Sequence, residues 1–361
     1  MKIVFLTTDI SQVGGVERVI CKLCNYFAEI YKYEIEIISV YKPKNENIYF
    51  DLNKYINIKY LNIESNDSSM NLIKRLNNQL KLIHSVGQAV KNEKFDILIT
   101  TNTMLGVGAA LHRKYADGKI IAAEHGDYFY FGKVWRYLRR RLYNKLDKIV
   151  VLTQKDKEIY DSFLNNVIVI PNPLPFEIDT KSSLDKKIIL TAGRLEDEKG
   201  FEYIIDAFVY ISKKHPDWKL EIVGEGSRKN FLVEKIKNLG LDESVKISDF
   251  TNNMVDKYIN SSIYTLTSKT EAFPLVILEA MECGVPCVSF DLAGPKEIIK
   301  DGDDGYITPQ YDIEKLVKQI NYIIENKDVR VQMGANAKNN IQRYSIKNIA
   351  FRWNSLFKEM S

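Results

Sequence analysis

Residues 188–224 read IILTAGRLEDEKGFEYIIDAFVYISKKHPDWKLEIVG, and they hold two short apolar runs on either side of a segment with helical spacing. The runs IILTAG and KLEIVG are typical of buried strands, because they are short and end at glycine. The spacing between them predicts a helix from about Gly200 to His215. A strand, a covering helix and a second strand favour a parallel sheet.

The same alternation extends almost to both ends of the chain. A further helix is predicted from about Val16 to Tyr31. Strand candidates before the quoted stretch are KIVFLTT, EIEIISV, FDILIT, KIIAAE, KIVVLT and VIVIPN, at residues 2–8, 34–40, 95–100, 119–124, 148–153 and 167–172. Strand candidates after it are VKISDF, SIYTLTS and PCVSF, at residues 245–250, 262–268 and 286–290. The sequence therefore predicts an α/β protein with parallel sheets covered by helices.

The alternation pauses once, at PNPLPFEIDTKSSLDKK, residues 171–187. Its three prolines and the polar stretch after them are typical of a linker. A chain of 361 residues favours two domains. We therefore expect Rossmann-like domains over residues 1–175 and 185–343, and a separate final segment over 344–361.

The final segment is predicted to be one helix, from Ile346 to Met360. Its apolar residues recur at helical spacing, so the helix is expected to pack by one face. They are Ile349, Trp353, Leu356 and Phe357.

The composition is that of a globular protein, with 45% apolar and 27% charged residues. No apolar run approaches the ~18 residues that cross a bilayer, and the N-terminal sequence does not resemble a signal peptide. We therefore expect a cytoplasmic protein with reduced cysteines. Cys21 and Cys24 form C-x-x-C inside a helical pattern, which favours thiols packed in the core over a metal or redox site.

The net charge of +4 hides a basic segment at residues 133–148, where seven basic residues accompany one acid. At helical spacing this segment has an apolar stripe of Trp135, Leu138, Leu142 and Leu146. The stripe could lie on an anionic membrane surface, with basic residues around it. It could equally pack on the first lobe. The membrane hypothesis names Trp135, Arg136, Arg139, Arg140 and Arg141. A patch this local does not favour nucleic acid.

Gly14 and Gly15 stand between the first strand and the first helix. Glycines let a phosphate approach the backbone, and a helix N-terminus offers free N–H donors. A tight turn without a ligand would use the same residues, so this pair alone leaves both interpretations open.

Arg194 and Lys199 follow the strand IILTAG, in the loop before the next helix. Two cations at the carboxyl end of a strand suit a diphosphate. An ordinary charged surface loop is the alternative.

Residues 270–291, TEAFPLVILEAMECGVPCVSFD, make the diphosphate the stronger interpretation. Pro274 is predicted as the first helical residue, which leaves the amides of Leu275 and Val276 free for an anion. Glu271 precedes this helix and Glu279 lies more than a turn into it. These two carboxylates could bind hydroxyls of a sugar and of a ribose.

Together these segments resemble the family 4 glycosyltransferases, which have the GT-B fold. The resemblance rests on GGVER (14–18), AEHG (123–126), AGRLEDEKG (192–200), VGEG (223–226) and the spacing of the two glutamates. It implies two Rossmann-like lobes that face a central cleft, with the C-terminal helix returning to the N-terminal, acceptor-binding lobe.

The resemblance also implies site roles. Gly14 and Gly15 would contact the donor diphosphate, with the Gly15 amide presented to it. The loop and helix residues Arg194, Lys199, Leu275 and Val276 would complete that diphosphate site. Glu279 would bind the ribose. The donor sugar would be contacted by Glu271, His125, Phe273 and Pro274, of which Glu271 and His125 are the expected catalytic residues. Many members have glycine where this chain has Ala272.

The expected reaction is a retaining transfer of a hexose or N-acetylhexosamine from a UDP-sugar. The expected acceptor is a glycan or a lipid-linked oligosaccharide, in capsule, lipopolysaccharide or related glycoconjugate synthesis at the inner face of a bacterial membrane. No metal or other cofactor is expected, since cations and amides can stabilise the leaving group. Asp301 and Asp303 match D-x-D, but their glycine-rich surroundings indicate a turn.

Three alternative functions share parts of this sequence pattern. A dehydrogenase would have G-x-G-x-x-G after its first strand, which is missing here. A sugar-binding protein of the cell envelope would begin with a signal peptide. Another GT-B enzyme, such as a nucleotide-sugar epimerase or a phosphorylase, is the closer alternative.

Overall fold

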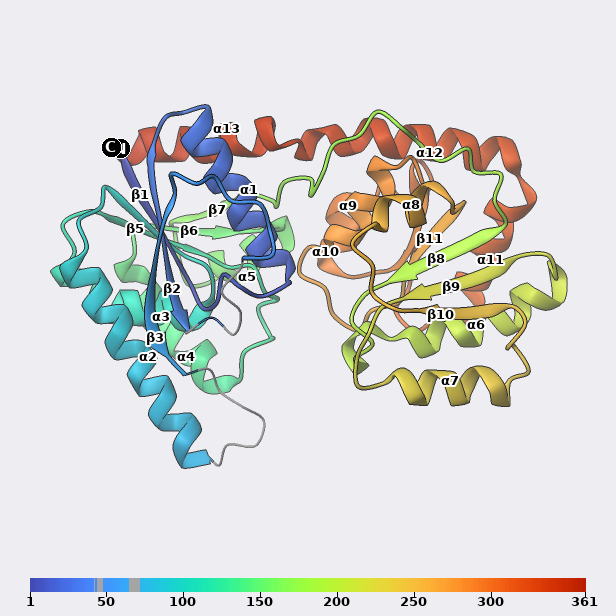
Figure 1. Ribbon diagram of the computed structural model, residues 1–361, viewed down its shortest axis with the longest axis horizontal. Coiled ribbons are helices and arrows are strands. Elements are labelled where there is room, and N and C mark those ends of the chain that lie inside the picture. The colour runs from blue at the N-terminus through green and yellow to red at the C-terminus, as the bar shows by residue number, and fades with distance from the viewer. Residues whose placement is uncertain (42, 44–47, 65–71) are drawn as a thin grey trace. The chain divides into compact units, whose positions relative to one another are not determined.

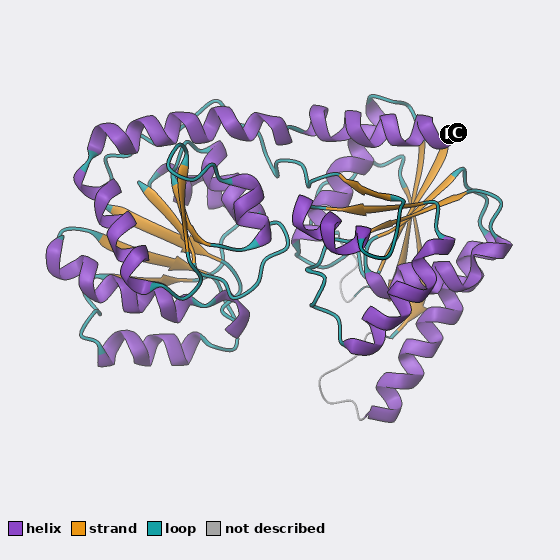
Figure 2. Ribbon diagram, turned by 180° about the vertical axis from the view of Figure 1, so that it is seen from behind, coloured by secondary structure: helices purple, strands orange, loops and turns teal. Residues whose placement is uncertain are grey.

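A computed structural model describes residues 1–41, 43, 48–64 and 72–361 of the chain (Figure 1). The chain forms two compact units. The first unit comprises Met1–Pro173 and Ile346–Ser361, and the second comprises Leu174–Ser345. Each unit is a parallel sheet with helices on both of its faces (Figure 2). The α/β class predicted from the alternation is confirmed.

The first unit has a seven-stranded parallel sheet in the order β3-β2-β1-β4-β5-β6-β7 over its described residues. Its strands are β1 (Lys2–Thr7), β2 (Glu34–Tyr41), β3 (Asn57–Ile63), β4 (Ile97–Thr100), β5 (Lys119–Ala123), β6 (Lys148–Val151) and β7 (Val167–Val169). Its helices are α1 (Gly15–Glu29), α2 (Leu72–Asn92), α3 (Thr103–His112), α4 (Lys133–Leu142), α5 (Gln154–Asp161) and α13 (Ile346–Met360).

The second unit has a six-stranded parallel sheet in the order β10-β9-β8-β11-β12-β13. Its strands are β8 (Ile188–Ala192), β9 (Lys219–Val223), β10 (Val245–Ser248), β11 (Ile263–Leu266), β12 (Cys287–Phe290) and β13 (Gly305–Thr308). Its helices are α6 (Phe201–Lys214), α7 (Lys229–Asn238), α8 (Met254–Ile259), α9 (Leu275–Glu282), α10 (Ala293–Ile298), α11 (Ile313–Glu325) and α12 (Lys327–Ile341).

The strands that the apolar runs predict are present, and most differ from the prediction by one to three residues at an end. The central strands of both sheets are covered on both faces, which is why they read as continuous apolar runs. The sequence interpretation did not identify β3, β13, α2, α3, α5, α8, α10, α11 or α12. β3 is an edge strand whose side chains are largely half-buried or exposed, so its apolar signal is weak.

The C-terminal helix α13 packs against α1 in the first unit, as expected (Figure 1). The rings of Phe357 and Phe27 meet edge to face at 5.4 Å, and the Tyr33 hydroxyl donates to Asn354 Oδ1 at 2.6 Å. Burying aromatic rings in this way adds to stability. The predicted apolar face of the helix is therefore confirmed.

The four cysteines are buried free thiols. Cys21 and Cys24 lie on the inner face of α1, so their packing in the core is confirmed. Burial raises the pKa of Cys21 to about 12.

Candidate active site

Two loops of the second unit meet where the strand order of its sheet reverses. The neighbouring strands β8 and β11 lie at this point, with β9 on one side and β12 on the other. Ligands of open α/β sheets bind beyond the carboxyl ends of such strands. The loops that leave those ends are residues 193–200 and 267–274. We call them the switch loops.

A charged contact joins the two switch loops. Lys199 Nζ lies 2.6 Å from Glu271 Oε1, and the Ser268 hydroxyl donates to the same oxygen at 3.0 Å. The Lys199 and Glu271 side chains are 22% and 12% exposed. The sequence assigns Lys199 to the diphosphate and Glu271 to the sugar, and the structure brings these two side chains into contact. It also adds Ser268, which the interpretation missed because serine is common in loops.

Arg194 lies in the same loop as Lys199 but is far more exposed. Its side chain is 74% exposed, and Nη2 lies 3.1 Å from Glu198 Oε1. Ion pairs as open to water as this one contribute about 0 to 1 kcal/mol. The Arg194 guanidinium can therefore exchange Glu198 for an anionic ligand at little cost.

Glycines allow these loops to pack closely. Gly200 has φ +59°, and a Cβ there would overlap the carbonyl oxygen of Thr267 in the other switch loop. Thr267 in turn donates its hydroxyl to the Gly200 carbonyl at 2.9 Å. Gly226 of the VGEG segment would have its Cβ 2.5 Å from the Leu195 oxygen. Both glycines are thus required by close backbone approach.

Helix α9 begins directly after the second switch loop. Its first amide with an intrahelical bond is that of Ile277, which donates to the Pro274 carbonyl at 3.1 Å. Leu275 and Val276 precede it, in the first turn, where amides have no partner within the helix. The partial positive charge of a helix N-terminus favours anions. The amides of Leu275 and Val276 therefore lie where a helix N-terminus can bind an anion.

The residues before α9 differ from the sequence prediction in where the helix begins. Pro274 precedes the helix as its N-cap, with φ −73° and ψ 106°, instead of being the first helical residue. The Phe273 ring is 6% exposed and packs edge to face on Tyr344 at 5.4 Å. The ring is therefore held by the protein, and contact of Phe273 with a sugar stays a prediction. Gly294 lets the second switch loop pack closely against it, since a Cβ at this position would lie 2.6 Å from the Ala272 oxygen.

Glu279 lies on the inner side of α9. It is 5% exposed, and its Oε2 accepts a hydrogen bond of 2.7 Å from the Tyr258 hydroxyl. Tyr258 is fully buried on α8. Burial, together with the nearby Glu279 carboxylate, raises the pKa of Tyr258 well above its usual value. A deeply buried phenol thus holds the predicted ribose ligand, and no sequence motif identifies this partner.

The first sheet reverses its strand order between β1 and β4. Gly14 caps α1 after β1, with φ −136° and ψ 165°, and Gly15 is the first helical residue. A Cβ on Gly14 would overlap the carboxyl of Glu17. Burial raises the pKa of Glu17 to about 7, and the charge of Asp9 adds to the shift. The glycine therefore makes room for a buried carboxyl, which an acid in the first helical turn could have indicated.

His125 follows β5 in the same sheet. Burial lowers its pKa to about 4, and Asn172 opposes that shift. The imidazole is therefore neutral near pH 7. Within the described part of the chain, its buried Nδ1 has no hydrogen-bond partner.

The predicted membrane stripe packs internally. Leu146 is buried in the core of the first unit, and Trp135, Leu138 and Leu142 pack against that core. Arg139 is 0% exposed, so it is not part of a surface patch. Arg136 is half-buried, whereas Arg140 and Arg141 are exposed. Helical periodicity could not separate the two alternatives, because an amphipathic helix on a protein core has the same periodicity as one on a membrane.

Asp301 and Asp303 lie in a turn, as expected from their glycine-rich surroundings. Gly302 between them has φ +82°, and Asp301 Oδ1 accepts from the Ile307 amide at 2.9 Å. Asp303 Oδ1 accepts from the side-chain amide of Asn336 at 2.7 Å.

Comparison with known proteins assigns both halves of the chain. Residues 13–177 match the family model Glycosyltransferase Family 4, and residues 176–340 match Glycosyl transferases group 1. An uncharacterized glycosyltransferase of Haemophilus influenzae is 31% identical over 98% of this chain and 99% of its own length.

A second relative comes from Campylobacter jejuni and is 26% identical over 100% of this chain and 99% of its own length. By name it is an α-1,4-N-acetyl-D-galactosaminyltransferase for a saccharide on diNAcBac-PP-undecaprenol. Among solved structures, Anabaena HepE in complex with UDP superposes with a TM-score of 0.77 and 18% identity, over 99% of this chain and 100% of that one.

Proposed function

The chain belongs to glycosyltransferase family 4, and from this membership we propose that it is a retaining transferase that uses a UDP-sugar. The proposed donor carries a hexose or an N-acetylhexosamine. The proposed acceptor is a glycan or lipid-linked oligosaccharide of bacterial surface polysaccharide or glycoconjugate synthesis. The names of the Campylobacter relative and of the UDP complex support these choices.

One observation carries the proposal. The Lys199–Glu271 contact joins the two switch loops at the strand-order reversal, and Glu271 lies in the loop that leads into the first turn of α9. A cation, free amides and a carboxylate are the groups that a nucleoside diphosphate and a sugar would need. We assign Lys199, Arg194 and the amides of Leu275 and Val276 to the diphosphate, and Glu271 to the sugar. Glu279 is assigned to the ribose.

In the first unit, Gly14 and Gly15 are proposed to contact the diphosphate and His125 the transferred sugar. A neutral His125 can accept a hydrogen bond from a hydroxyl or donate one to it, according to its tautomer. The proposed reaction breaks the bond from the anomeric carbon to the phosphate oxygen. The acceptor oxygen bonds to that carbon on the same face, and the acceptor proton passes to the departing phosphate.

Transfer is proposed to need no metal. As the bond to phosphate breaks, negative charge grows on the leaving nucleotide, and cations with preorganised amides can stabilise it. We expect transfer to persist in excess EDTA. Complete loss of activity that Mn²⁺ or Mg²⁺ restores would contradict the metal-free assignment.

Contact with an anionic membrane is proposed through the outer side of α4 and the residues before it. No helix in the described ranges is long and apolar enough to cross a bilayer. The exposed apolar side chains of this surface are Phe129, Tyr130, Val134 and Tyr137. The exposed basic ones are Lys133, Arg140, Arg141 and Lys145. Aromatic and basic residues together favour an anionic interface. We call these eight residues the α4 surface.

The test is a panel of nucleotide sugars with and without acceptor. Thermal shift identifies the donor, since a ligand at 100 times its Kd adds about 2.7 kcal/mol of stability. NMR of the product then gives the anomeric configuration. A retained configuration with acceptor-dependent UDP release supports the proposal. Free sugar or an epimer as the main product would favour an epimerase, and phosphate-dependent cleavage would favour a phosphorylase. Sugar binding without turnover would favour a binding protein.

A further inference from the structure

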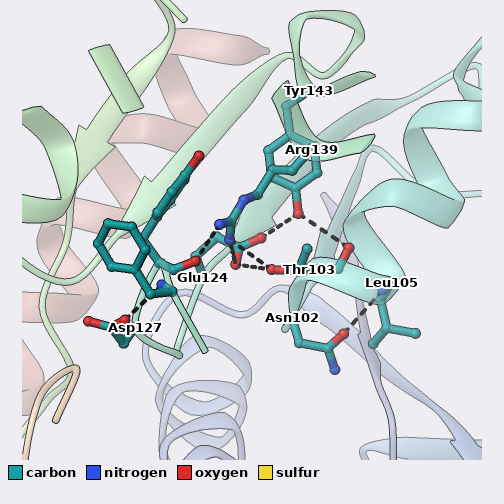
Figure 3. A network of polar contacts seen from close by, with 9 residues as sticks. Asn102, Thr103, Leu105, Glu124, Asp127, Arg139 and Tyr143 are labelled. Atoms are coloured by element: carbon teal, nitrogen blue, oxygen red, sulfur yellow. Dashed lines mark hydrogen bonds and ion pairs between the residues drawn. The ribbon is translucent and has the colours of Figure 1, made fainter. Parts of the chain in front are cut away.

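Figure 3 shows a polar network inside the first unit that joins Glu124, Arg139, Thr103 and Tyr143. Its centre is Glu124, the residue between β5 and His125, which is 4% exposed. Glu124 Oε2 accepts from the Thr103 hydroxyl at 2.6 Å and from Arg139 Nη1 at 3.3 Å. Its Oε1 accepts from the Tyr143 hydroxyl. Both carboxylate oxygens are thus bound from α3, α4 and the turn after α4.

Arg139 also binds the backbone beyond His125. Its Nη2 donates to the Tyr128 carbonyl at 2.7 Å, and its guanidinium stacks on the Tyr128 ring at 4.2 Å. One side chain therefore holds the chain before His125, through Glu124, and after it, through Tyr128. The three residues 125–127 are fixed at both ends.

The surrounding backbone fits this arrangement. The Glu124 amide donates to the Val150 carbonyl of β6 at 2.8 Å, so the strand pairing extends to Glu124. A Cβ on Gly106 would overlap the Tyr143 hydroxyl. The glycine in α3 therefore makes room for the bond from Tyr143 to Glu124.

Stability alone does not explain this network. Replacing a buried ion pair by apolar residues of similar volume is often neutral or stabilising, because the charges lose their hydration on burial. The network instead fixes the positions of its side chains, because an ion pair with additional hydrogen bonds is satisfied in few conformations.

We propose that Glu124, Arg139, Thr103 and Tyr143 are positioning residues that fix His125 for its part in transfer. The inference rests on the proposed function of His125. The four residues do not contact the substrate themselves. They act by setting where the imidazole lies, and small displacements of a reacting group can lower turnover up to about a hundredfold.

Two tyrosines provide a matched test. Tyr143→Phe removes the hydroxyl that binds Glu124. Tyr160→Phe removes a hydroxyl of a residue that is also buried, and this hydroxyl has no hydrogen-bond partner in the described ranges. Its ring lies 5.0 Å from the Arg139 guanidinium and is kept in the variant. Thr103→Val is a second, independent change to the network.

The measurements are kcat, the KM for the donor and the imidazole NMR signals of His125, one of four histidines. We expect Tyr143→Phe and Thr103→Val to lower kcat about tenfold, to leave the donor KM within about twofold, and to move the His125 signals. Tyr160→Phe should leave all three unchanged.

Unmoved His125 signals in both network variants would overturn the inference, as would equal changes in Tyr160→Phe. Unchanged kcat in both variants of an active enzyme would also overturn it. The NMR comparison does not depend on turnover. If no UDP-sugar is transferred, the proposed function fails while the positioning of His125 is still decided.

Discussion

Each unit has a cation and a glutamate beside its parallel sheet, but the two pairs differ in their access to water. The Lys199 and Glu271 side chains are 22% and 12% exposed, whereas those of Arg139 and Glu124 are 1% and 3% exposed. A pair that water reaches can exchange one partner for a ligand. A sealed pair cannot, because either charge alone would be buried without compensation. The first pair therefore suits substrate binding and the second suits positioning.

The largest effect is expected from breaking the sealed pair. Arg139→Met leaves the Glu124 carboxylate buried without its cation, which should cost about 3 to 5 kcal/mol of unfolding free energy. Denaturant unfolding measures the change. Arg140→Met is the control, since Arg140 is the next residue of the same helix but is exposed. Equal stability of the two variants would contradict the comparison.

Breaking the accessible pair should act on turnover instead of stability. Lys199→Met should lower kcat by about 10²- to 10³-fold, since it removes a preorganised cation. The matched control is Lys257→Met. Lys257 lies 2.7 Å from Glu221, with 31% and 14% of the two side chains exposed, and Ser248 donates to the same oxygen. This control pair lies away from the switch loops.

Kinetic assays and thermal unfolding of both lysine variants decide this point. Similar losses of activity in the two variants would mean that the Lys199 contact is an ordinary structural pair. Retained activity in Lys199→Met would remove Lys199 from the diphosphate site.

Glu17 is another buried carboxyl, and its pKa is raised. Burial places that pKa at about 7 in the folded protein, against an ordinary value of 4.5. The folded state therefore binds the proton more tightly, and stability should fall as pH rises from about 4.5 to about 7. The full shift corresponds to about 3 to 4 kcal/mol.

Glu17→Gln should flatten the pH dependence of stability in this window. Denaturant unfolding at several pH values between 4.5 and 8 measures it. An unchanged slope between the two proteins would show that Glu17 titrates normally.

Glu279 tests whether a carboxylate that is almost fully buried can still bind the ribose of a nucleotide. Glu279→Ala should weaken UDP binding by about 1.5 to 3 kcal/mol, the value of a hydrogen bond to a charged group. Tyr258→Phe, which removes the bond that holds this carboxylate, should weaken it less. Calorimetry with UDP gives both values, and unchanged affinity in Glu279→Ala would end the ribose assignment.

The smallest effect concerns charges on the α4 surface. Each basic residue near an anionic leaflet contributes about 1 kcal/mol, and salt screens this attraction. Joint replacement of Arg140 and Arg141 by Glu should reduce flotation with anionic vesicles at low ionic strength. The control replaces the exposed Lys213 and Lys237 of the second unit by Glu.

Equal flotation of these two double variants would contradict the choice of surface. Absence of flotation by the unmodified protein would contradict membrane contact itself.

The sequence was sufficient for the α/β class and most strands, because these depend on local pattern. Alternating apolar runs indicate parallel strands, and residues after a strand must lie at the carboxyl edge of its sheet. On this basis the sequence predicts a ligand site that includes Lys199, Glu271 and Glu279, and the family motifs add His125 to the prediction.

Contacts across the fold were decided by tertiary structure alone. The apolar stripe at residues 135–146 fits a membrane surface and the first lobe equally well, since helical periodicity does not say what covers an apolar face. The packing of Leu146 and the burial of Arg139 in the structure decide for the first lobe. The packing of the Phe273 ring on Tyr344 likewise joins residues that lie far apart in the sequence. The partners of Glu279 and Glu124 include Tyr258 and Tyr143, each about 20 residues away in the sequence. No local pattern links residues at such separations, because only the folded chain brings them together.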